Sequence, residues 1–381
     1  MIPRLYESEE TEFTTFGICP LPESISCLVT EGRNGQYTLE MEYPRSGMWF
    51  SEIKADRIIL ATAHDRDDHP QAFRIERIEG TISDIVTIYA VHISYQLNWI
   101  ILKKMTKYTR YAELAMSQMK RDALMGDGIC PFNFYSDIGT EESTPVYIST
   151  TEPTPFRSYL GGIEGSVLDT YGGEYEWDMW DVHLWQSRGE DNGVKIVYGK
   201  NLTGIDWETD LSETYTGAVA YYKSEDEEGQ EVYVEGDVQT ILNNTFAFHR
   251  IIVLDVSSEY ESTPTKAQLN TYASNYVNAN SVTPTVSFTL EFVPLWQTEE
   301  YKEYADFERV KLCDTVHIVY PPLGIELDAK VVKTVYNVLL DRYDSIEVST
   351  VRKNLSTTIF AMQKEIKRLS ISWISRRRLT R

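Results

Sequence analysis

Tyr37-Thr-Leu-Glu40 and Phe288-Thr-Leu-Glu291 open two stretches, about 250 residues apart, that resemble each other along their length. The first stretch continues with Ser51-Glu-Ile-Lys-Ala-Asp-Arg-Ile-Ile-Leu60, Phe73-Arg-Ile-Glu-Arg-Ile78 and Asp84-Ile-Val-Thr-Ile-Tyr89. The second continues with Tyr304-Ala-Asp-Phe-Glu-Arg-Val-Lys-Leu312, Asp328-Ala-Lys-Val-Val-Lys-Thr-Val335 and Asp344-Ser-Ile-Glu-Val348. These strand-like runs share their order and approximate spacing. They indicate a duplicated β module, through which a few subunits form a ring with twice as many lobes. The alternative explanation is that the two stretches look similar only because all half-buried strands have similar sequences.

Length and charge exclude several classes of protein. A chain of 381 residues can bury a sizeable core and is expected to form several domains. Its net charge of −22 argues against wrapping nucleic acid, which requires a positive surface, but is compatible with letting DNA pass. No apolar run approaches the ~20 residues of a membrane span, and the N-terminus lacks the apolar core of a secretion signal. We therefore expect no membrane insertion.

The four cysteines are scattered and form no CxxC pair. Neither a zinc knuckle nor a disulfide framework is indicated, so Cys19, Cys27, Cys130 and Cys313 are expected to be buried, reduced thiols. The sequence indicates no cofactor and no metal site.

The chain alternates between strand-rich and helical stretches. Asn34-Gly35 predicts a turn before the alternating run from Tyr37. A helix is expected within residues 107–125, with Thr109 as a possible N-cap, and a second short helix from Thr154 to about Gly172. Residues 175–186 alternate, and the turn 188–193 is expected to join them in a hairpin with residues 194–198. The spacing of Leu269, Tyr272, Ala273, Tyr276 and Val277 predicts a helix over residues 264–279.

The C-terminal 30 residues carry a different pattern, with apolar residues spaced 4-3-4-3-4. This spacing is typical of a coiled-coil seam, formed here by Leu355, Ile359, Met362, Ile366, Leu369 and Trp373. We expect the start of a coiled coil and therefore a homo-oligomer. Ile at position a with Leu at position d favours two strands, although the globular part can override that preference. The alternative is an amphipathic helix docked on its own domain.

Six strings resemble one protein family when they are taken in order. They are Asn34-Gly-Gln-Tyr-Thr-Leu-Glu-Met-Glu-Tyr-Pro44, Gln71-Ala-Phe-Arg-Ile75, Ala90-Val-His-Ile-Ser-Tyr-Gln-Leu97, Cys130-Pro-Phe-Asn-Phe-Tyr-Ser-Asp137, Leu160-Gly-Gly-Ile-Glu-Gly165 and Arg188-Gly-Glu-Asp-Asn-Gly-Val-Lys-Ile-Val-Tyr-Gly-Lys-Asn-Leu202. The chain resembles, from about residue 25 to about residue 350, the N-terminal part of phage and prophage tail proteins called prophage tail endopeptidases or tail-associated lysins, the baseplate hubs of long-tailed phages.

The resemblance implies a mainly β fold with α+β inserts: two similar β-barrel hub domains, two peripheral domains and a C-terminal helix. The expected domains are a first hub barrel at 1–100, a peripheral α+β insert at 101–190, a hairpin returning to the first barrel with a second peripheral region and helix 264–279 at 191–285, a second hub barrel at 286–350, and the C-terminal coiled-coil start at 351–381.

The resemblance also implies a function. Three chains would form a hub at the virion tail tip, assembled in the host cytoplasm, that joins the sixfold distal tail ring to a threefold tip. The implied partners are two further chains, the distal tail protein, and possibly the tape-measure and receptor-binding proteins. DNA would pass through a closable channel without specific binding.

The sequence contains no recognisable catalytic motif. Neither HExxH nor G-x-S-x-G occurs, and family members carry their hydrolase beyond the hub, so we expect this chain not to be an enzyme. His64 and His69 bracket an acidic loop, which favours a solvated turn over a metal site. Two alternatives stay open. One is a cell-wall hydrolase or peptidase within residues 100–190, and the other is a glycan-binding adhesin that uses Trp177, Trp180 and Trp185.

Overall fold

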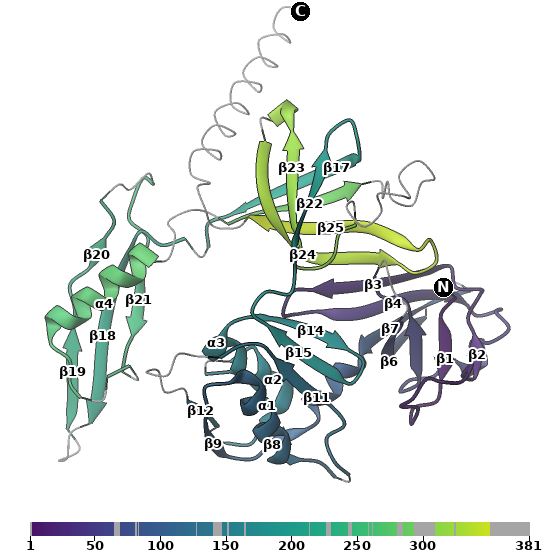
Figure 1. Cartoon of the computed structure of the whole chain (residues 1–381), viewed down its shortest axis with the longest axis horizontal. Helices are drawn as coiled ribbons and strands as arrows, with labels where there is room; N and C mark the ends of the chain where they lie inside the picture. The colour runs from purple at the N-terminus through teal and green to yellow at the C-terminus, as the bar shows by residue number, and fades with distance from the viewer. Residues whose placement is uncertain are drawn as a thin grey trace, which may run out of the picture. The chain divides into compact units, whose positions relative to one another are not determined.

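The computed structural model of the chain is mainly β, with few helices, which confirms the predicted fold class (Figure 1). The structure describes residues 2–64, 69–80, 82, 84–126, 128–139, 147–150, 152–163, 165–212, 214–225, 230–242, 246–257, 259–260, 262–279, 285–292, 309–323 and 325–350. No helix among them is long and apolar enough to cross a membrane.

The chain forms two compact units. Unit 1 contains residues 1–206, 289–321 and 326–348, and unit 2 contains residues 207–288, 322–325 and 349–381. The strands β17 (Leu202–Asp210) and β22 (Thr285–Phe292) lead the chain into and out of unit 2.

The first part of unit 1 is an antiparallel sheet with strand order β3-β4-β7-β6-β5-β1-β2. Its strands are β1 (Arg4–Tyr6), β2 (Cys19–Pro20), β3 (Ser26–Gly32), β4 (Tyr37–Pro44), β5 (Ile58–Ala61), β6 (Gln71–Gly80) and β7 (Ile85–His92), with a short 3-10 helix η1 (Phe50–Glu52) before β5. Apolar residues alternate along β3, β4 and β7 and bury one face of each strand. The predicted turn lies between β3 and β4, where Asn34 has a φ of 56°, a conformation that Asn tolerates better than most residues.

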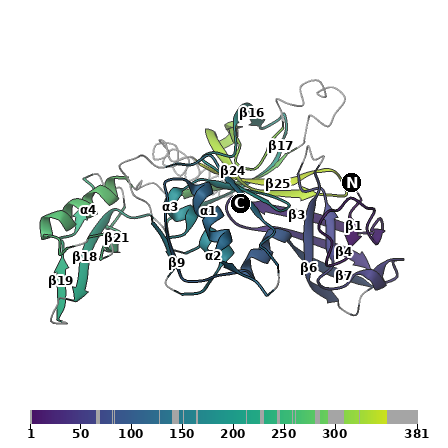
Figure 2. The ribbon, with the colours of Figure 1, turned by 60° about the horizontal axis from the view of Figure 1, so that its bottom comes forward.

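The second part of unit 1 continues the same sheet (Figures 1 and 2). Its strands are β16 (Asp191–Val197), β23 (Thr315–Tyr320), β24 (Ile325–Asn337) and β25 (Arg342–Thr350), with η5 (Pro321–Leu323) between β23 and β24. β24 pairs antiparallel with β3, so that Lys333 lies opposite Gly32 and Asn337 opposite Leu28. The two halves of the predicted duplication therefore share one continuous sheet, and the closure of each half into a barrel stays a prediction.

The strand order repeats. The first half is ordered β3-β4-β7-β6-β5, and the second half, which contributes β17 and β22 to β25 in chain order, is ordered β17-β22-β25-β24-β23. We name these two five-strand sets module 1 and module 2. Numbered along the chain, the first to fifth strands of the two modules therefore take equivalent places in the sheet. β3 corresponds to β17, β4 to β22, β5 to β23, β6 to β24 and β7 to β25.

Two residues mark the same point in each module. Asp56 and Cys313 both have a φ of 73°. The Asp56 N–H donates to Ile75 O at 2.8 Å, and the Cys313 N–H donates to Val331 O at 2.9 Å. The return bonds also match, because Ile75 N donates to Arg57 O at 2.9 Å and Val331 N donates to Asp314 O at 2.8 Å. Asp56 thus corresponds to Cys313, and Ile75 corresponds to Val331.

This correspondence corrects the sequence alignment at one run. Residues 304–312 are not the counterpart of β5, because the equivalent strand is β23, which begins at Thr315. Ala305-Asp306 has the same sequence as Ala55-Asp56, which led to the alignment of these two runs. The hydrogen bonds instead place Cys313 at the position equivalent to Asp56. Residues 301–308 themselves lie outside the described part of the chain.

The predicted hairpin over residues 175–198 is wrong in its second half. Residues 174–185 form their own hairpin, whereas β16 pairs parallel with β23, with Lys195 opposite His317. The side chain of Asp314 accepts the Glu190 N–H at 3.0 Å, and the Thr315 N–H donates to Glu190 O at 3.0 Å. These bonds start the parallel ladder and direct β16 to module 2, not back to module 1.

The insert between the modules is an α+β region. Its elements are η2 (Ile93–Asn98), β8 (Ile101–Leu102), β9 (Met105–Tyr108), α1 (Ala112–Arg121), β10 (Ala123–Leu124), β11 (Asn133–Ser136), β12 (Tyr147–Thr150), β13 (Thr154–Pro155), α2 (Phe156–Leu160), α3 (Val167–Tyr171), β14 (Glu174–Asp178) and β15 (Asp181–Trp185). β14, β15 and β11 form one small sheet, β10, β8 and β13 a second, and β12 pairs with β9.

Both predicted helices of the insert are shorter than expected. α1 begins at Ala112 because residues 105–108 pair with β12 instead, and its N-cap is Tyr111, not Thr109. The predicted helix after Thr154 is divided into α2 and α3, since Gly161 and Gly162 interrupt it and Gly162 has a φ of 124°.

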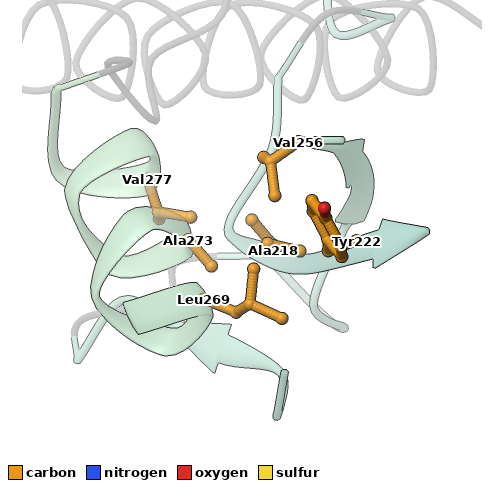
Figure 3. Close-up of a cluster of buried hydrophobic side chains, with 7 residues drawn as sticks. Ala218, Tyr222, Val256, Leu269, Ala273 and Val277 are labelled. Carbon is orange, nitrogen blue, oxygen red and sulfur yellow. The ribbon is translucent and has the colours of Figure 1, made fainter. Parts of the chain in front are cut away.

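Unit 2 has its own core. It consists of β18 (Gly217–Glu225), β19 (Glu231–Glu235), β20 (Gln239–Thr240), β21 (Ile251–Asp255) and α4 (Lys266–Ala279). The predicted stripe of α4 faces β18 (Figure 3). The buried cluster is Ala218, Ala220, Tyr222, Val256, Leu269, Ala273 and Val277. The helix predicted at 264–279 is observed two residues shorter at its start.

We expect Leu269→Ala to destabilise unit 2 by about 2–5 kcal/mol, because Leu269 is 0% exposed and its removal leaves a cavity against β18. Hydrogen–deuterium exchange checks this as faster exchange of the β18 amides, with the amides of β4 in unit 1 unchanged. Asn275→Ala, at an exposed position of the same helix, should leave both rates unchanged. Equal rates in wild type and Leu269→Ala would contradict the assigned core.

Candidate functional site

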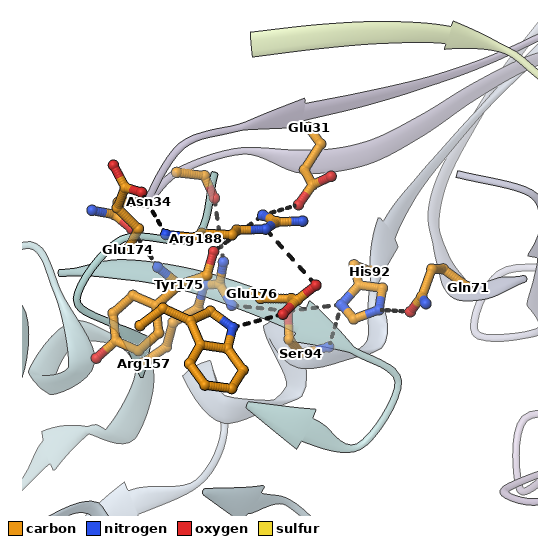
Figure 4. Close-up of polar contacts among 12 residues, drawn as sticks. Glu31, Asn34, Gln71, His92, Ser94, Arg157, Glu174, Tyr175, Glu176 and Arg188 are labelled. Carbon is orange, nitrogen blue, oxygen red and sulfur yellow. Dashed lines mark hydrogen bonds and ion pairs between the residues drawn. The ribbon is translucent and has the colours of Figure 1, made fainter. Parts of the chain in front are cut away.

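Polar side chains of module 1 and the insert form a network of hydrogen bonds and ion pairs (Figure 4), to which Lys330 of module 2 also contributes. At the centre, Arg188 Nη1 donates to Glu31 Oε1 at 2.7 Å and to Tyr175 O at 3.2 Å. Glu31 lies on β3 and is 3% exposed. Burial opposes the charge of Arg188, but the Glu31 carboxylate and then Glu176 outweigh it and raise the pKa of the guanidinium. The pair is therefore fully charged, and removing one partner of such a pair typically costs about 3–5 kcal/mol.

Glu174 connects three segments of the chain. Its carboxylate accepts hydrogen bonds from Lys330 of β24 and from the Arg188 N–H, the latter at 2.9 Å, and lies 3.5 Å from Arg33 Nη1. Burial opposes the charged form of Glu174, yet these donors and cations together lower the pKa of its carboxyl group. The insert is thereby tied to both modules through one buried carboxylate.

The β3–β4 turn is anchored on the insert by Asn34. Its Oδ1 accepts the Tyr175 N–H at 2.7 Å, and its Nδ2 donates to Gly173 O at 3.0 Å. The sequence predicted the turn from Asn34-Gly35, but gave no sign that the amide would hold β14. We name the set Glu31, Asn34, Glu174, Arg188 and Lys330 the polar junction.

Gly189 allows the insert to approach module 2. A Cβ at this position would lie 1.9 Å from Cys313 O and 2.4 Å from Asp314 N, so no larger residue fits without moving the backbone. Asp314 is 4% exposed, and burial raises the pKa of its carboxyl group although two backbone N–H groups donate to it. The junction thus extends from β16 to the turn before β23.

A histidine and a serine next to the junction have the spacing of a nucleophile and its base. His92 Nδ1 lies 3.0 Å from Ser94 Oγ, while His92 Nε2 lies 3.1 Å from Gln71 Oε1. Both side chains are 0% exposed, and the ring of His92 stacks on Tyr37 with centroids 4.4 Å apart. Burial lowers the pKa of His92 well below its usual value, and the charge of Arg157 lowers it further. The neutral, enclosed ring fits packing of the core and offers no face to a substrate.

A cavity of about 280 Å³ lies beside the junction. Its lining is mixed in charge and comprises Glu31, Tyr37, His64, His69, Gln71, Glu176, Trp177, Asp178, Arg188, Lys311, Leu312, Thr334 and Tyr343. Within the described part of the chain, no group of three or more His, Cys, Asp or Glu side chains is placed to hold a metal ion. The acidic residues 65–68 between His64 and His69 lie outside that part.

The three candidate glycan-binding tryptophans do not share one surface. Trp177 is 7% exposed and stacks on Tyr175 at 5.0 Å, and the Arg157 guanidinium lies 4.4 Å from the centre of its ring. Trp180 donates its indole N–H to Thr11 O at 3.0 Å and packs on Phe132, and Trp185 donates to Glu176 Oε2 at 2.7 Å. Packing accounts for all three side chains, and glycan contact stays a prediction.

Two other predictions concern cysteines and the C-terminal seam. All four cysteines are free and buried, as expected. The seam residues Leu355, Ile359, Met362, Ile366, Leu369 and Trp373 lie outside the described residues, so the coiled coil stays a prediction.

Comparisons with known proteins agree with the resemblance. The family model described as prophage endopeptidase tail matches residues 190–359. The prophage tail protein gp18 from Listeria monocytogenes EGD-e has 14% identity and a TM-score of 0.56 over 96% of this chain and 100% of that one. The 43 kDa tail protein of prophage MuSo2 from Shewanella oneidensis has 9% identity and a TM-score of 0.58 over 92% and 98%. None of the curated proteins matches the sequence.

A tail protein from Neisseria meningitidis MC58 is also similar, with 11% identity and a TM-score of 0.54 over 94% of this chain and 98% of that chain. These matches confirm the resemblance to prophage tail proteins, and at such identities they establish a shared fold. The family match lies in the C-terminal half, whereas most of the six strings lie before residue 190, so the two signals are largely independent.

We expect Glu174→Gln to lower the free energy of unfolding at pH 7 by about 1–3 kcal/mol, because Lys330 loses a charged acceptor. Since the pKa of Glu174 is lowered in the folded chain, its stabilisation is present above the unfolded pKa of about 4.3 and is lost as pH falls through the folded value. Denaturant unfolding at several pH values should therefore show variant and wild type converging in acid. Glu9→Gln, an exposed control, should match wild type throughout. A difference independent of pH would contradict the assignment.

Proposed function

We propose that this protein is a structural component of a phage tail, a homotrimeric hub at the tail tip that joins a sixfold ring to a threefold tip. The observation that carries the proposal is the repeated strand order of modules 1 and 2, together with the matching φ angles and hydrogen bonds at Asp56 and Cys313. Two equivalent modules per chain give three chains six equivalent lobes. The fold shared with three tail proteins, two of them from prophages, supports a place in the tail.

The modules are alike in the sheet and differ at one hairpin tip. β3 and β4 are joined by the short turn at Asn34, whereas β17 and β22, at the same place in module 2, are separated by the chain of unit 2. A trimer would therefore repeat its sheet six times and unit 2 three times. That is the combination an adaptor between sixfold and threefold neighbours requires.

The polar junction supports a rigid scaffold. Arg188 and Glu174 bind the insert to both modules with charge-assisted hydrogen bonds, which are stronger than those between neutral groups. Asn34 adds two neutral hydrogen bonds between module 1 and the insert. A rigid insert and a second peripheral unit would offer surfaces to other tail proteins. The partners in this proposal are the distal tail ring and possibly the tape-measure and receptor-binding proteins, with assembly in the host cytoplasm.

The charge of the chain supports a conduit for DNA. Three copies at −22 carry a net charge of −66, and acids facing a lumen would repel phosphate and keep DNA from binding to the wall. DNA would therefore pass without specific contacts. The C-terminal seam would begin the threefold tip.

The proposal assigns no endopeptidase activity to this chain, although the matching family carries that word in its description. In the described residues, the His92–Ser94 pair has catalytic spacing but is closed to solvent, and an enzyme needs both the pair and access to it. We expect no clearing in a peptidoglycan zymogram loaded with the purified chain beside a lysozyme control. Clearing would favour the hydrolase alternative within residues 100–190.

We expect the purified wild-type chain to have a mass of about 132 kDa, three times 43.9 kDa, by light scattering, with six-lobed rings in negative stain. Ile359→Asp with Ile366→Asp should weaken this association, because two charges enter the apolar seam. Thr357→Asp with Lys364→Asp places aspartates off the seam and should leave the trimer intact. If the first variant is still a trimer, the C-terminal coiled coil does not contribute to the assembly. A wild-type monomer at high concentration would contradict the trimer.

A further inference from the structure

Within one chain, the two modules meet edge to edge. Residues Lys333–Asn337 of β24 pair with Leu28–Gly32 of β3, and this pairing buries Thr334 and Tyr336 on one strand and Val29 and Glu31 on the other. Each module thus uses one edge for this contact: module 2 uses the end of β24, and module 1 uses β3.

Because the modules are equivalent, each should have a second edge that matches the one its partner module uses in this contact. β6 occupies the place of β24, and β17 occupies the place of β3. Because Ile75 corresponds to Val331, Arg74 of β6 corresponds to Lys330 of β24. β6 has a bulge between Ile75 and Arg77, so Arg77 lies within one residue of the place of Lys333. Residues Arg77–Gly80 of β6 therefore lie at the place of the part of β24 that pairs with β3.

Among the described residues, neither of these two edges is paired with a further strand. Residues Arg77–Gly80 pair with β7 on one side, and the pairing with β5 on the other side ends at Arg74. Glu76, Arg77, Glu79 and Gly80 are exposed, whereas their counterparts on β24 are buried or half-buried. In the described residues β17 ends the strand order, with Thr203, Asp206 and Trp207 exposed and Trp207 at 46%. Open strand edges of this kind are templates for pairing with another chain.

We propose that β6 of one copy pairs with β17 of the next copy, in the way that β24 pairs with β3 inside the chain. The proposal rests on the homo-oligomer proposed above and specifies its interface. Each copy then presents one β6 edge and one β17 edge, which makes a heterologous contact that closes into a ring. Contacts within and between chains alternate around the ring, and three chains give six module boundaries.

Charge is compatible with this contact. Arg77 extends from β6 beside Glu79, and β17 offers Asp206 and Glu208. Arg77 lies within one residue of the place that Lys333 takes at the internal boundary, so β6 and β24 each carry a cation there. The main-chain hydrogen bonds of a strand ladder do not depend on side-chain charge, which allows two acidic chains to meet at these edges.

Cysteine crosslinking in the full chain tests the contact. Ile78→Cys combined with Ile205→Cys, and Arg77→Cys combined with Asp206→Cys, belong to one antiparallel register and place thiols on both faces of the two strands. A short bismaleimide tolerates a register error of one residue, a step of about 3.3 Å. We expect covalent dimers and trimers on a denaturing gel. The native cysteines are buried, so the unmodified chain is the background control, and Lys54→Cys with Ile205→Cys is the misplaced control.

Light scattering on the same samples separates the two proposals. A trimer without crosslinks from either strand pair overturns the β6–β17 contact and leaves the hub standing. A monomer overturns both. Crosslinked trimers from the strand pairs, with none from the control, support both.

A charge variant gives a second measurement. Arg77→Glu should raise the dissociation constant of the trimer by on the order of tenfold. At each of the three interfaces, the introduced glutamate and Glu79 of β6 would then face Asp206 and Glu208 of β17 with no cation between them. Lys54→Glu makes the same change of charge at an exposed position before β5 and should leave the constant unchanged. Equal constants for the two variants would count against Arg77 at the interface.

Discussion

The pairing of β24 with β3 is the contact on which the rest of unit 1 depends. It joins two modules of like strand order into one sheet and sets Glu31 opposite Thr334 at the boundary. Glu31 is thereby removed from water, and a buried carboxylate needs a cation. Arg188 provides it from the end of the insert, which fixes where the insert must lie. One strand pairing therefore determines the position of an element almost a hundred residues long in sequence.

The buried charges of the junction are better explained by positioning than by stability. A well-packed apolar pair often stabilises a protein as much as a buried ion pair, because both charges lose their hydration. A charged pair nevertheless tolerates few alternative arrangements, since any shift leaves an unpaired charge in the interior. Glu174 illustrates this constraint, because it holds Lys330 of module 2 and the Arg188 N–H of the insert at the same time. A ring built from such chains requires that kind of fixed internal geometry.

The sequence predicted features that are local and failed where distant residues decide. The Asn34-Gly35 turn, the stripe of α4 and the four buried thiols could be read from short patterns, because each depends on neighbouring residues. The parallel pairing of β16 with β23 could not, since it depends on Asp314, more than a hundred residues away. The alignment of residues 304–312 failed because Cys313 takes the backbone conformation of Asp56 without sharing its chemistry. The polar junction was missed for the same reason: Glu31, Glu174 and Lys330 belong to no motif.

In the proposed ring, the duplication would also explain how an acidic chain assembles with itself. At −22 per copy, contact between exposed side chains is opposed by repulsion over most of the surface. Pairing between strand edges is less affected by this repulsion, because it is made by hydrogen bonds between main-chain N–H and C=O groups, which carry no net charge. Unit 2 lies between β17 and β22, at a hairpin tip, a place where insertions disturb the sheet least. The insertion therefore leaves the strand edges of both modules intact. The edges of β24 and β3 pair within the chain, and those of β6 and β17 are the other pair. A repeated module with one such unpaired set of edges is the simplest unit from which a closed ring can form.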